Sequence, residues 1–198
     1  MDVGRKEIIG ILGGSFNPVH TGHMMIAAYL TQWGYVDKVW LTLSPLNPLK
    51  DAAGLLPDSE RLAMLKIATG ETTDILTCDI ELSMPRPSYT IDTLDLLSRR
   101  HKDKQFKLII GSDNWCIFDR WREHRRILEQ YGVMVYPRPG YPIEPGRAAG
   151  MEVIDAPTVN LSSTFVRDAI AAGKDMSVFL PPGVYKYIRD NRLYSNIL

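Results

Sequence analysis

The 198-residue sequence lacks the features that mark membrane-inserted and exported proteins. No apolar run is long enough to span a bilayer, and the apolar stretch before the first glycine turn is too short for a signal peptide. There are only two cysteines, Cys78 and Cys116, and their spacing suits neither a metal site nor a C-x-x-C motif. We therefore expect two free, partly buried thiols in a reducing compartment, and a cytoplasmic protein.

An excess of one charge is also lacking, because 23 basic residues balance 23 acidic residues. A chain without net charge has no broad electrostatic field that would attract nucleic acid or an anionic membrane. We expect neither partner. A local pocket for an anion is still compatible with this composition.

Several common nucleotide-binding motifs are missing. The sequence has no G-x-x-x-x-G-K-[ST] segment and hence no P-loop. The turn at residues 10–14 does not match G-x-G-x-x-G, and no acidic residue follows the second expected strand, where a dinucleotide ribose would bind. These absences disfavour an NAD-dependent dehydrogenase. Since no cluster of metal-ligating side chains is visible, we expect any Mg²⁺ to be carried by the phosphates of ATP.

Short apolar runs alternate with helical patterns along the chain. The runs suit strands buried on both faces, and they cover residues 8–12, 39–43, 75–78, 107–110, 133–136 and 152–155. Helices are expected at residues 21–33, 59–69, 90–100, 123–130, 164–172 and 182–190. This alternation predicts an α/β fold with a Rossmann-like, doubly wound, mainly parallel sheet and two C-terminal helices. The length suits a single domain over residues 1–198.

Two long loops, residues 44–57 and 137–150, each follow an expected strand. Open α/β sheets bind ligands at the carboxyl ends of their strands, so we expect both loops at the same edge as the first glycine turn. Gly173 suits the position after the first C-terminal helix, and Pro182 suits the first turn of the second.

The segment GGSFNPVHTGH at residues 13–23 joins the first expected strand to the first expected helix. Gly13 and Gly14 let the backbone approach phosphate oxygens, and the helix start offers unpaired N–H groups to an anion. His20 and His23 add donors that can carry positive charge near neutral pH. The segment therefore predicts a site for a nucleoside triphosphate.

A second segment, LSSTFVR at residues 161–167, predicts another helix start. Ser162 or Ser163 is a natural N-cap, and Arg167 follows about one turn later. Both segments resemble signatures of the nucleotidyltransferase superfamily. The first matches every fixed position of G-x-F-x-P-x-H-x-G-H, and the second matches I-S-S-T-x-x-R with Leu161 in place of Ile. The resemblance implies that the second segment holds the phosphates of ATP.

Further segments are similar to motifs of bacterial nicotinate mononucleotide adenylyltransferases: PSYTIDT at 87–93, GSD at 111–113 followed by Trp121, and YPRPG at 136–140. The chain departs from that family at Leu49, where a histidine is expected, and at Asn17, which replaces the commoner Asp with another turn-compatible side chain. Lys50 is still expected to reach a phosphate.

The resemblance implies adenylyl transfer from ATP to nicotinate mononucleotide, with deamido-NAD and pyrophosphate as products. It implies that Gly111 and Asp113 meet the adenosine of ATP. It also implies that Tyr89, Thr90 and Trp121 surround the pyridine ring and its carboxylate. An indole can stack on a flat pyridinium, and a helix start at Thr90 offers donors to a carboxylate.

The expected catalytic residues are His20, His23 and Arg167, with His23 nearest to the α-phosphate. The expected ATP-binding residues are Gly13, Gly14, Ser15, Phe16, His20, His23, Lys50, Gly111, Asp113, Arg138, Ser162, Ser163, Thr164 and Arg167. Those expected for the mononucleotide are Tyr89, Thr90, Trp121 and Arg122. A carboxylate only accepts hydrogen bonds, so backbone N–H groups beside Trp121 and Arg122 favour the acid over the amide.

Two alternatives stay open at this point. One is another adenylyl- or cytidylyltransferase, acting on phosphopantetheine or a phospho-alcohol. The other is a regulator that binds a nucleotide without turnover. The sequence does not indicate an oligomeric state.

Overall fold

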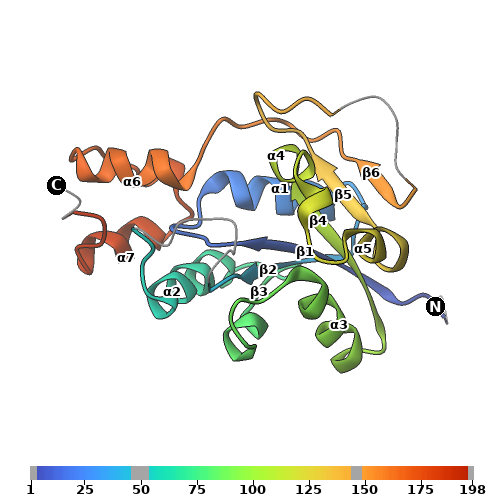
Figure 1. Ribbon diagram of the computed structural model, residues 1–198. Helices are drawn as coiled ribbons and strands as arrows, with labels where there is room; N and C mark the ends of the chain where they lie inside the picture. The colour runs from blue at the N-terminus through green and yellow to red at the C-terminus, as the bar shows by residue number, and fades with distance from the viewer. Residues whose placement is uncertain (1–3, 46–53, 144–148, 196–198) are drawn as a thin grey trace.

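The computed structural model describes residues 4–45, 54–143 and 149–195, and these contain one parallel sheet (Figure 1). Its strand order is β3-β2-β1-β4-β5-β6, which is the order of a Rossmann-type doubly wound sheet. The strands are β1 (Glu7–Gly14), β2 (Lys38–Leu43), β3 (Ile75–Cys78), β4 (Lys104–Gly111), β5 (Val133–Tyr136) and β6 (Met151–Val153). Each lies where the apolar runs predicted a strand.

Helices connect and cover these strands. The α-helices of the described residues are α1 (Thr21–Gln32), α2 (Asp58–Thr69), α3 (Thr90–Arg100), α4 (Ser112–Trp115), α5 (His124–Gln130), α6 (Ser163–Ala171) and α7 (Val184–Asp190). Three short 3-10 helices are η1 (Ile80–Ser83), η2 (Phe118–Arg120) and η3 (Ser177–Phe179). In Figure 1, α6 and α7 lie at the end of the molecule opposite to the N-terminus.

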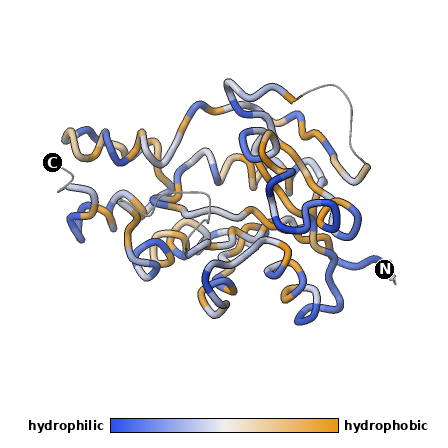
Figure 2. The backbone as a smooth tube through the Cα atoms, in the orientation of Figure 1, coloured by the Kyte–Doolittle hydropathy of each residue, from blue (hydrophilic) through white to orange (hydrophobic). Residues whose placement is uncertain are grey.

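The sheet is buried on both faces. Ile11 and Leu12 are neighbours in β1, so their side chains point to opposite faces, and they belong to different buried clusters. One cluster joins the sheet to α1, α2, α6 and α7, and the other joins it to α3 and α5. Figure 2 shows hydrophobic residues along the sheet and hydrophilic ones at many outer turns. The predicted Rossmann-like, doubly wound fold is confirmed.

Two predictions from the sequence, for Gly173 and Pro182, concern the ends of the C-terminal helices. Gly173 follows α6 with φ 72°, and the N–H of Lys174 bonds to the carbonyl of Ala169, so its predicted place is confirmed. The prediction for Pro182 was wrong. Helix α7 begins at Val184, and the preceding Gly183 has φ 84°, a left-handed conformation that keeps Pro182 outside the helix.

Two simpler expectations concern cysteine and the membrane. Cys78 is buried, Cys116 is exposed and both are free, which confirms unpaired thiols and corrects the expectation that each is partly buried. Burial raises the pKa of the Cys78 thiol. None of the helices in the described part of the chain has the length and apolarity to span a membrane.

The carboxyl ends of the central strands form one edge. In the sheet register Gly14 pairs with Leu43, Gly111 pairs with Tyr136, and Leu12 of β1 pairs with Ile109 of β4, so four strands end at the same level. The N–H of Ser44 donates to the carbonyl of Gly14 at 2.9 Å. Both long loops leave from this edge, as predicted.

The buried guanidinium of Arg61, in α2, ties these strand ends together. Its side chain is 0% exposed. Nη1 donates to the carbonyl oxygens of Ser15 and Ser44 at 2.7 and 2.8 Å. Nε and Nη2 donate to the carbonyls of Leu56 and Pro45 and to the carboxylate of Asp58. All five N–H groups of the guanidinium therefore have acceptors.

Replacement of this arginine should destabilise the fold. In Arg61→Met, four carbonyls and Oδ1 of Asp58 lose the donor that Arg61 supplies. We expect the free energy of unfolding to fall by about 3–5 kcal/mol, as when one partner is removed from a buried ion pair. Urea denaturation measures it, with Arg99→Met on the exposed side of α3 as the control. Equal stabilities of the two variants would contradict this role.

Candidate active site

The turn after β1 is shaped by the aromatic ring of Phe16, which packs against Gly14 at the end of the strand. Phe16 has φ 44° and is buried. A Cβ atom on Gly14 would lie 3.1 Å from the ring of Phe16, so any larger residue would press on this ring. The Phe16 ring meets the ring of His23 edge-on, with centroids 5.0 Å apart. The side chain of Phe16 therefore supports His23, and only its backbone is left to meet a ligand.

The two histidines of the motif stack on each other at the start of α1. Their ring centroids are 3.7 Å apart with an interplanar angle of 21°. The backbone N–H of His20 donates to Nδ1 of His23 at 3.2 Å. Because Nδ1 accepts this bond, the neutral form of His23 carries its proton on Nε2. The backbone thus fixes which nitrogen of His23 can donate to an anion.

His20 corrects one sequence expectation. Its side chain is 4% exposed, and burial, with a smaller contribution from the charge of Arg138, lowers its pKa from 6.5 to about 4. The expectation of positive charge near neutral pH is therefore wrong for His20 in this structure. Its imidazole is neutral at this pH. A Cβ atom on Gly22 would lie 3.1 Å from Nδ1 of His20, so Gly22 makes room for this ring.

The second motif packs directly against the first. Ser162 is the N-cap of α6, and its Oγ accepts from the N–H of Phe165. Ser163 Oγ donates to the carbonyl of Pro18 at 2.8 Å. Arg167 Nη1 donates to the carbonyl of Asn17 at 2.9 Å. Segments that are far apart in the sequence thus meet at one place, as a shared phosphate site requires.

Arg167 is oriented further by the helix that carries it. Its Nη2 donates to Oγ1 of Thr164 at 3.2 Å, one turn earlier in α6. The expected phosphate-binding hydroxyls and this guanidinium therefore share one helix end. Lys50 and Leu49 lie outside the described residues.

Sequence reasoning missed the buried role of Asn17. Its Nδ2 donates to the carbonyl of Gly54 at 2.9 Å. Its Oδ1 accepts from the N–H of Leu56 and from the hydroxyl of Tyr194. Tyr194 lies near the other end of the chain, so no local pattern predicts this contact. Asn17 connects the histidine loop to the loop after β2 and to the C-terminal region.

The ends of β4 and β5 carry a polar pair. A Cβ atom on Gly111 would lie 2.4 Å from Oδ1 of Asp113 and 2.6 Å from Cδ of Arg138. These two side chains therefore lie against the strand end only because residue 111 is glycine. Nε of Arg138 is 3.8 Å from Oδ1 of Asp113. That buried oxygen has no hydrogen-bond donor within the described residues, so it can accept one from a ligand hydroxyl.

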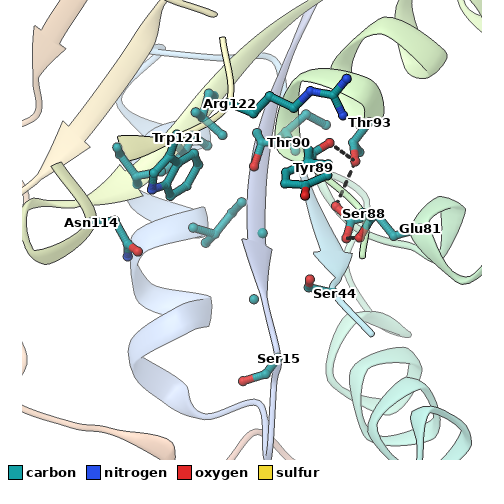
Figure 3. A pocket seen from close by; sticks show the side chains of 18 of the residues that line it. Ser15, Ser44, Glu81, Ser88, Tyr89, Thr90, Thr93, Asn114, Trp121 and Arg122 are labelled. Atoms are coloured by element: carbon teal, nitrogen blue, oxygen red, sulfur yellow. Dashed lines mark hydrogen bonds between the residues drawn. The ribbon is translucent and has the colours of Figure 1, made fainter. Parts of the chain in front are cut away.

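A cavity of about 190 Å³ opens at this edge of the sheet. Tyr89, Thr90, Trp121 and Arg122 all line it, so the structure brings together the four residues expected around the mononucleotide. Gly13, Gly14, Ser15 and Gly111 of the expected ATP site line it too. In Figure 3, Trp121 and Asn114 lie on one side of β1, and Tyr89, Ser88 and Glu81 lie on the other.

The aromatic side chains of this cavity, Tyr89 and Trp121, are accompanied by a guanidinium and a buried N–H donor. The guanidinium of Arg122 lies 4.9 Å from the centre of the Tyr89 ring, within cation–π range. Nε1 of Trp121 is buried and has no acceptor among the residues that the structure describes. An indole N–H can only donate, so it suits a ligand oxygen.

A smaller hollow of about 30 Å³ lies beside the main cavity. His20, His23 and Arg138 line it, and Tyr136 lines both hollows. Burial raises the pKa of Tyr136, so its hydroxyl is neutral between them. The histidine loop and the aromatic cavity are therefore neighbouring parts of one site.

Comparison with known proteins gives three findings. Residues 11–169 match the model of the cytidylyltransferase-like family. A protein named "Probable nicotinate-nucleotide adenylyltransferase" from Bacteroides fragilis is 45% identical over 184 residues, covering 92% of each chain. A protein of the same name from Bacteroides thetaiotaomicron is 44% identical over 182 residues, covering 91% of this chain and 90% of its own.

A solved structure shares the fold. It is the Plasmodium falciparum nicotinic acid mononucleotide adenylyltransferase complexed with NaAD, which superposes with a TM-score of 0.76 at 19% identity. The match covers 96% of this chain and 98% of the other. At this level of identity the likeness concerns the fold alone.

The burial of His20 predicts a specific dependence of stability on pH. Between pH 6.5 and about 4, unfolded His20 binds a proton that folded His20 does not. The free energy of unfolding therefore falls as the pH falls through this window. We expect His20 to contribute about 2 kcal/mol of this fall between pH 7 and pH 5.

Urea denaturation of the wild type and of His20→Asn at both pH values isolates this contribution. The variant should show the smaller loss of stability at pH 5, because its side chain does not titrate. The same pH dependence in both proteins would show that His20 is not buried as a neutral group.

Proposed function

The chain belongs to the cytidylyltransferase-like family, and we propose that it transfers the adenylyl group of ATP to nicotinate mononucleotide in NAD biosynthesis. The products are deamido-NAD and pyrophosphate. The names of relatives at 44–45% identity support this reaction. The expected alternatives, another acceptor or a regulator without turnover, have no specific observation in their favour.

One observation carries the assignment of the acceptor. The four side chains expected around the pyridine ring line a single cavity, although they come from the start of α3 and from the segment after η2. The cavity offers an aromatic indole for the flat ring, with a buried donor on Trp121 for an oxygen. The N-terminus of α3 at Thr90 adds backbone donors for a carboxylate.

For ATP we propose that the histidine loop and the start of α6 hold the triphosphate. His23 donates from Nε2 to the α-phosphate, and neutral His20 supports it by stacking. Arg167 binds the departing phosphates together with Ser162, Ser163, Thr164 and Lys50. Gly111 and Asp113 meet the adenosine, with Asp113 accepting from a hydroxyl, and Arg138 contacts the phosphates or the adenine.

The chemistry requires positioning and charge stabilisation more than proton transfer. A phosphate oxygen of the mononucleotide attacks the α-phosphorus of ATP, and the bond from that phosphorus to the β-phosphate oxygen breaks. Pyrophosphate leaves with the electron pair. The attacking phosphate is largely dianionic near neutral pH, because its second pKa is about 6. It needs no general base, so alignment in line with the leaving group is the main task of the protein.

We propose that Mg²⁺ enters with ATP and neutralises charge on its phosphates. Within residues 4–45, 54–143 and 149–195, no group of three or more His, Cys, Asp or Glu side chains is arranged to hold a metal ion. A single nucleotidyltransferase domain over residues 1–198, a cytoplasmic location and the lack of a nucleic-acid partner stay predictions from the sequence.

Removal of the His23 imidazole should slow the chemical step. His23→Ala loses the donor at the α-phosphate, and we expect kcat to fall by about 10²- to 10³-fold, as for other charge-stabilising donors. His101→Ala, outside the cavity at the end of α3, is the matched control. Steady-state kinetics with both substrates measures the effect. Wild-type turnover by a folded His23→Ala protein would refute this role.

Pyrophosphate release from ATP tests the function itself. The purified protein is assayed with nicotinate mononucleotide, nicotinamide mononucleotide and phosphopantetheine in parallel. We expect release with the nicotinate compound and much slower release with the amide, in which an NH2 donor replaces one acceptor oxygen of the carboxylate. Release with phosphopantetheine alone would support another acceptor. ATP binding without release on any acceptor would support the regulator.

A further inference from the structure

Glu81 is a buried carboxylate in the wall of the main cavity to which the proposed chemistry gives no role. It belongs to η1, its residue is 8% exposed, and it lines the cavity with Ser88, Tyr89 and Thr90. No salt bridge of Glu81 occurs within the described residues. Burial raises its pKa, and the hydroxyls of Ser88, Thr93 and Ser44 act in the opposite direction. Hydroxyl donors therefore take the place of a cationic partner.

The two oxygens of Glu81 are bound to different parts of one segment. Ser88 Oγ donates to Oε2 at 2.8 Å, and Thr93 Oγ1 donates to Oε1 at 3.0 Å (Figure 3). Ser88 precedes Tyr89, which is the N-cap of α3, and Thr93 lies in the first turn of this helix. The carboxylate thus bridges the approach to α3 and its first turn.

This bridge lies in the same cavity wall as the expected acceptor site. Between Ser88 and Thr93 lie Tyr89 and Thr90, whose side chains and backbone form the wall proposed for the pyridine ring and its carboxylate. Thr93 Oγ1 is also 3.3 Å from the carbonyl of Tyr89. A hydroxyl has one proton, and a carboxylate is the stronger acceptor, so the bond to Glu81 fixes the hydroxyl.

We propose that Glu81 is a positioning residue that holds residues 88–90 in the geometry that binds the acceptor mononucleotide. This inference rests on the proposed function. The kinetic effect of losing Glu81 should be confined to one of the two substrates. Glu81 acts on the end of the cavity that takes the mononucleotide, and the motifs proposed to bind ATP phosphates lie on other elements. A loss of the carboxylate should therefore raise the KM for the mononucleotide without a matching change in the KM for ATP.

The test compares Glu81→Gln and Glu81→Ala with the wild type in steady-state kinetics. Hydrogen bonds to a charged group are the strong ones, so we expect Glu81→Ala to raise the KM for nicotinate mononucleotide about 10- to 100-fold. We expect a smaller rise for Glu81→Gln, which keeps the shape and one acceptor oxygen. The KM for ATP and kcat should stay within about threefold, as a positioning role beside the acceptor predicts. Glu71→Gln, an exposed glutamate, is the matched control.

Ser88→Ala and Thr93→Val remove the hydroxyls that donate to Glu81. They test the same hydrogen bonds even if the Glu81 variants do not fold. Each should raise the same KM with little effect on ATP. An unchanged KM for the mononucleotide in folded variants would overturn the proposal, and so would equal rises for both substrates. Calorimetry of nicotinate mononucleotide binding separates the proposed function from the positioning role of Glu81. A wild type that binds it but does not release pyrophosphate refutes the function and leaves Glu81 testable through Kd. A wild type that does not bind it refutes both.

Discussion

The geometry of the whole site depends on one buried cation. Arg61 donates to carbonyl oxygens of the turn after β1 and of the loop after β2, and it is bound in turn by Asp58 at the start of α2. Its planar fork donates five hydrogen bonds, to four carbonyls and one carboxylate, whereas the ammonium of a lysine has only three donors. Two loops that leave neighbouring strands are thereby fixed to a third element. His20 and His23 follow Ser15 by only a few residues, so Arg61 fixes the chain close to the histidine loop.

The site near Arg61 contains neutral hydrogen-bond donors and separate cations rather than a cluster of charged side chains. His20 is neutral because it is buried, and the backbone determines the donor atom of His23. Arg167 is tied to the carbonyl of Asn17, which fixes the direction from which this cation would meet the proposed triphosphate. Preorganised donors of this kind stabilise charge that develops during phosphoryl transfer without reorganising at that moment. This arrangement agrees with a chain of zero net charge.

The fold, and the meeting of many expected site residues at one edge of the sheet, could be predicted because their signals are local. A strand buried on both faces, a glycine turn and a serine helix cap each leave a pattern within a few residues. The contacts that fix the site are not local. Nothing in the sequence around Arg61 shows that its side chain is buried, and Asn17 and Tyr194 meet across 177 positions. The neutral state of His20 depends on burial by the folded chain, and the start of α7 depends on the conformation of Gly183.

In the proposed reaction the adenylyl group passes directly from ATP to the mononucleotide, and the protein forms no covalent bond to it. The stereochemical course at the α-phosphorus distinguishes this path from a two-step transfer. ATP with sulfur in one defined position on the α-phosphate would be incubated with nicotinate mononucleotide, and the configuration of the thio-substituted product determined. A single in-line displacement predicts inversion. Retention would indicate two displacements through an adenylylated side chain and would refute direct transfer.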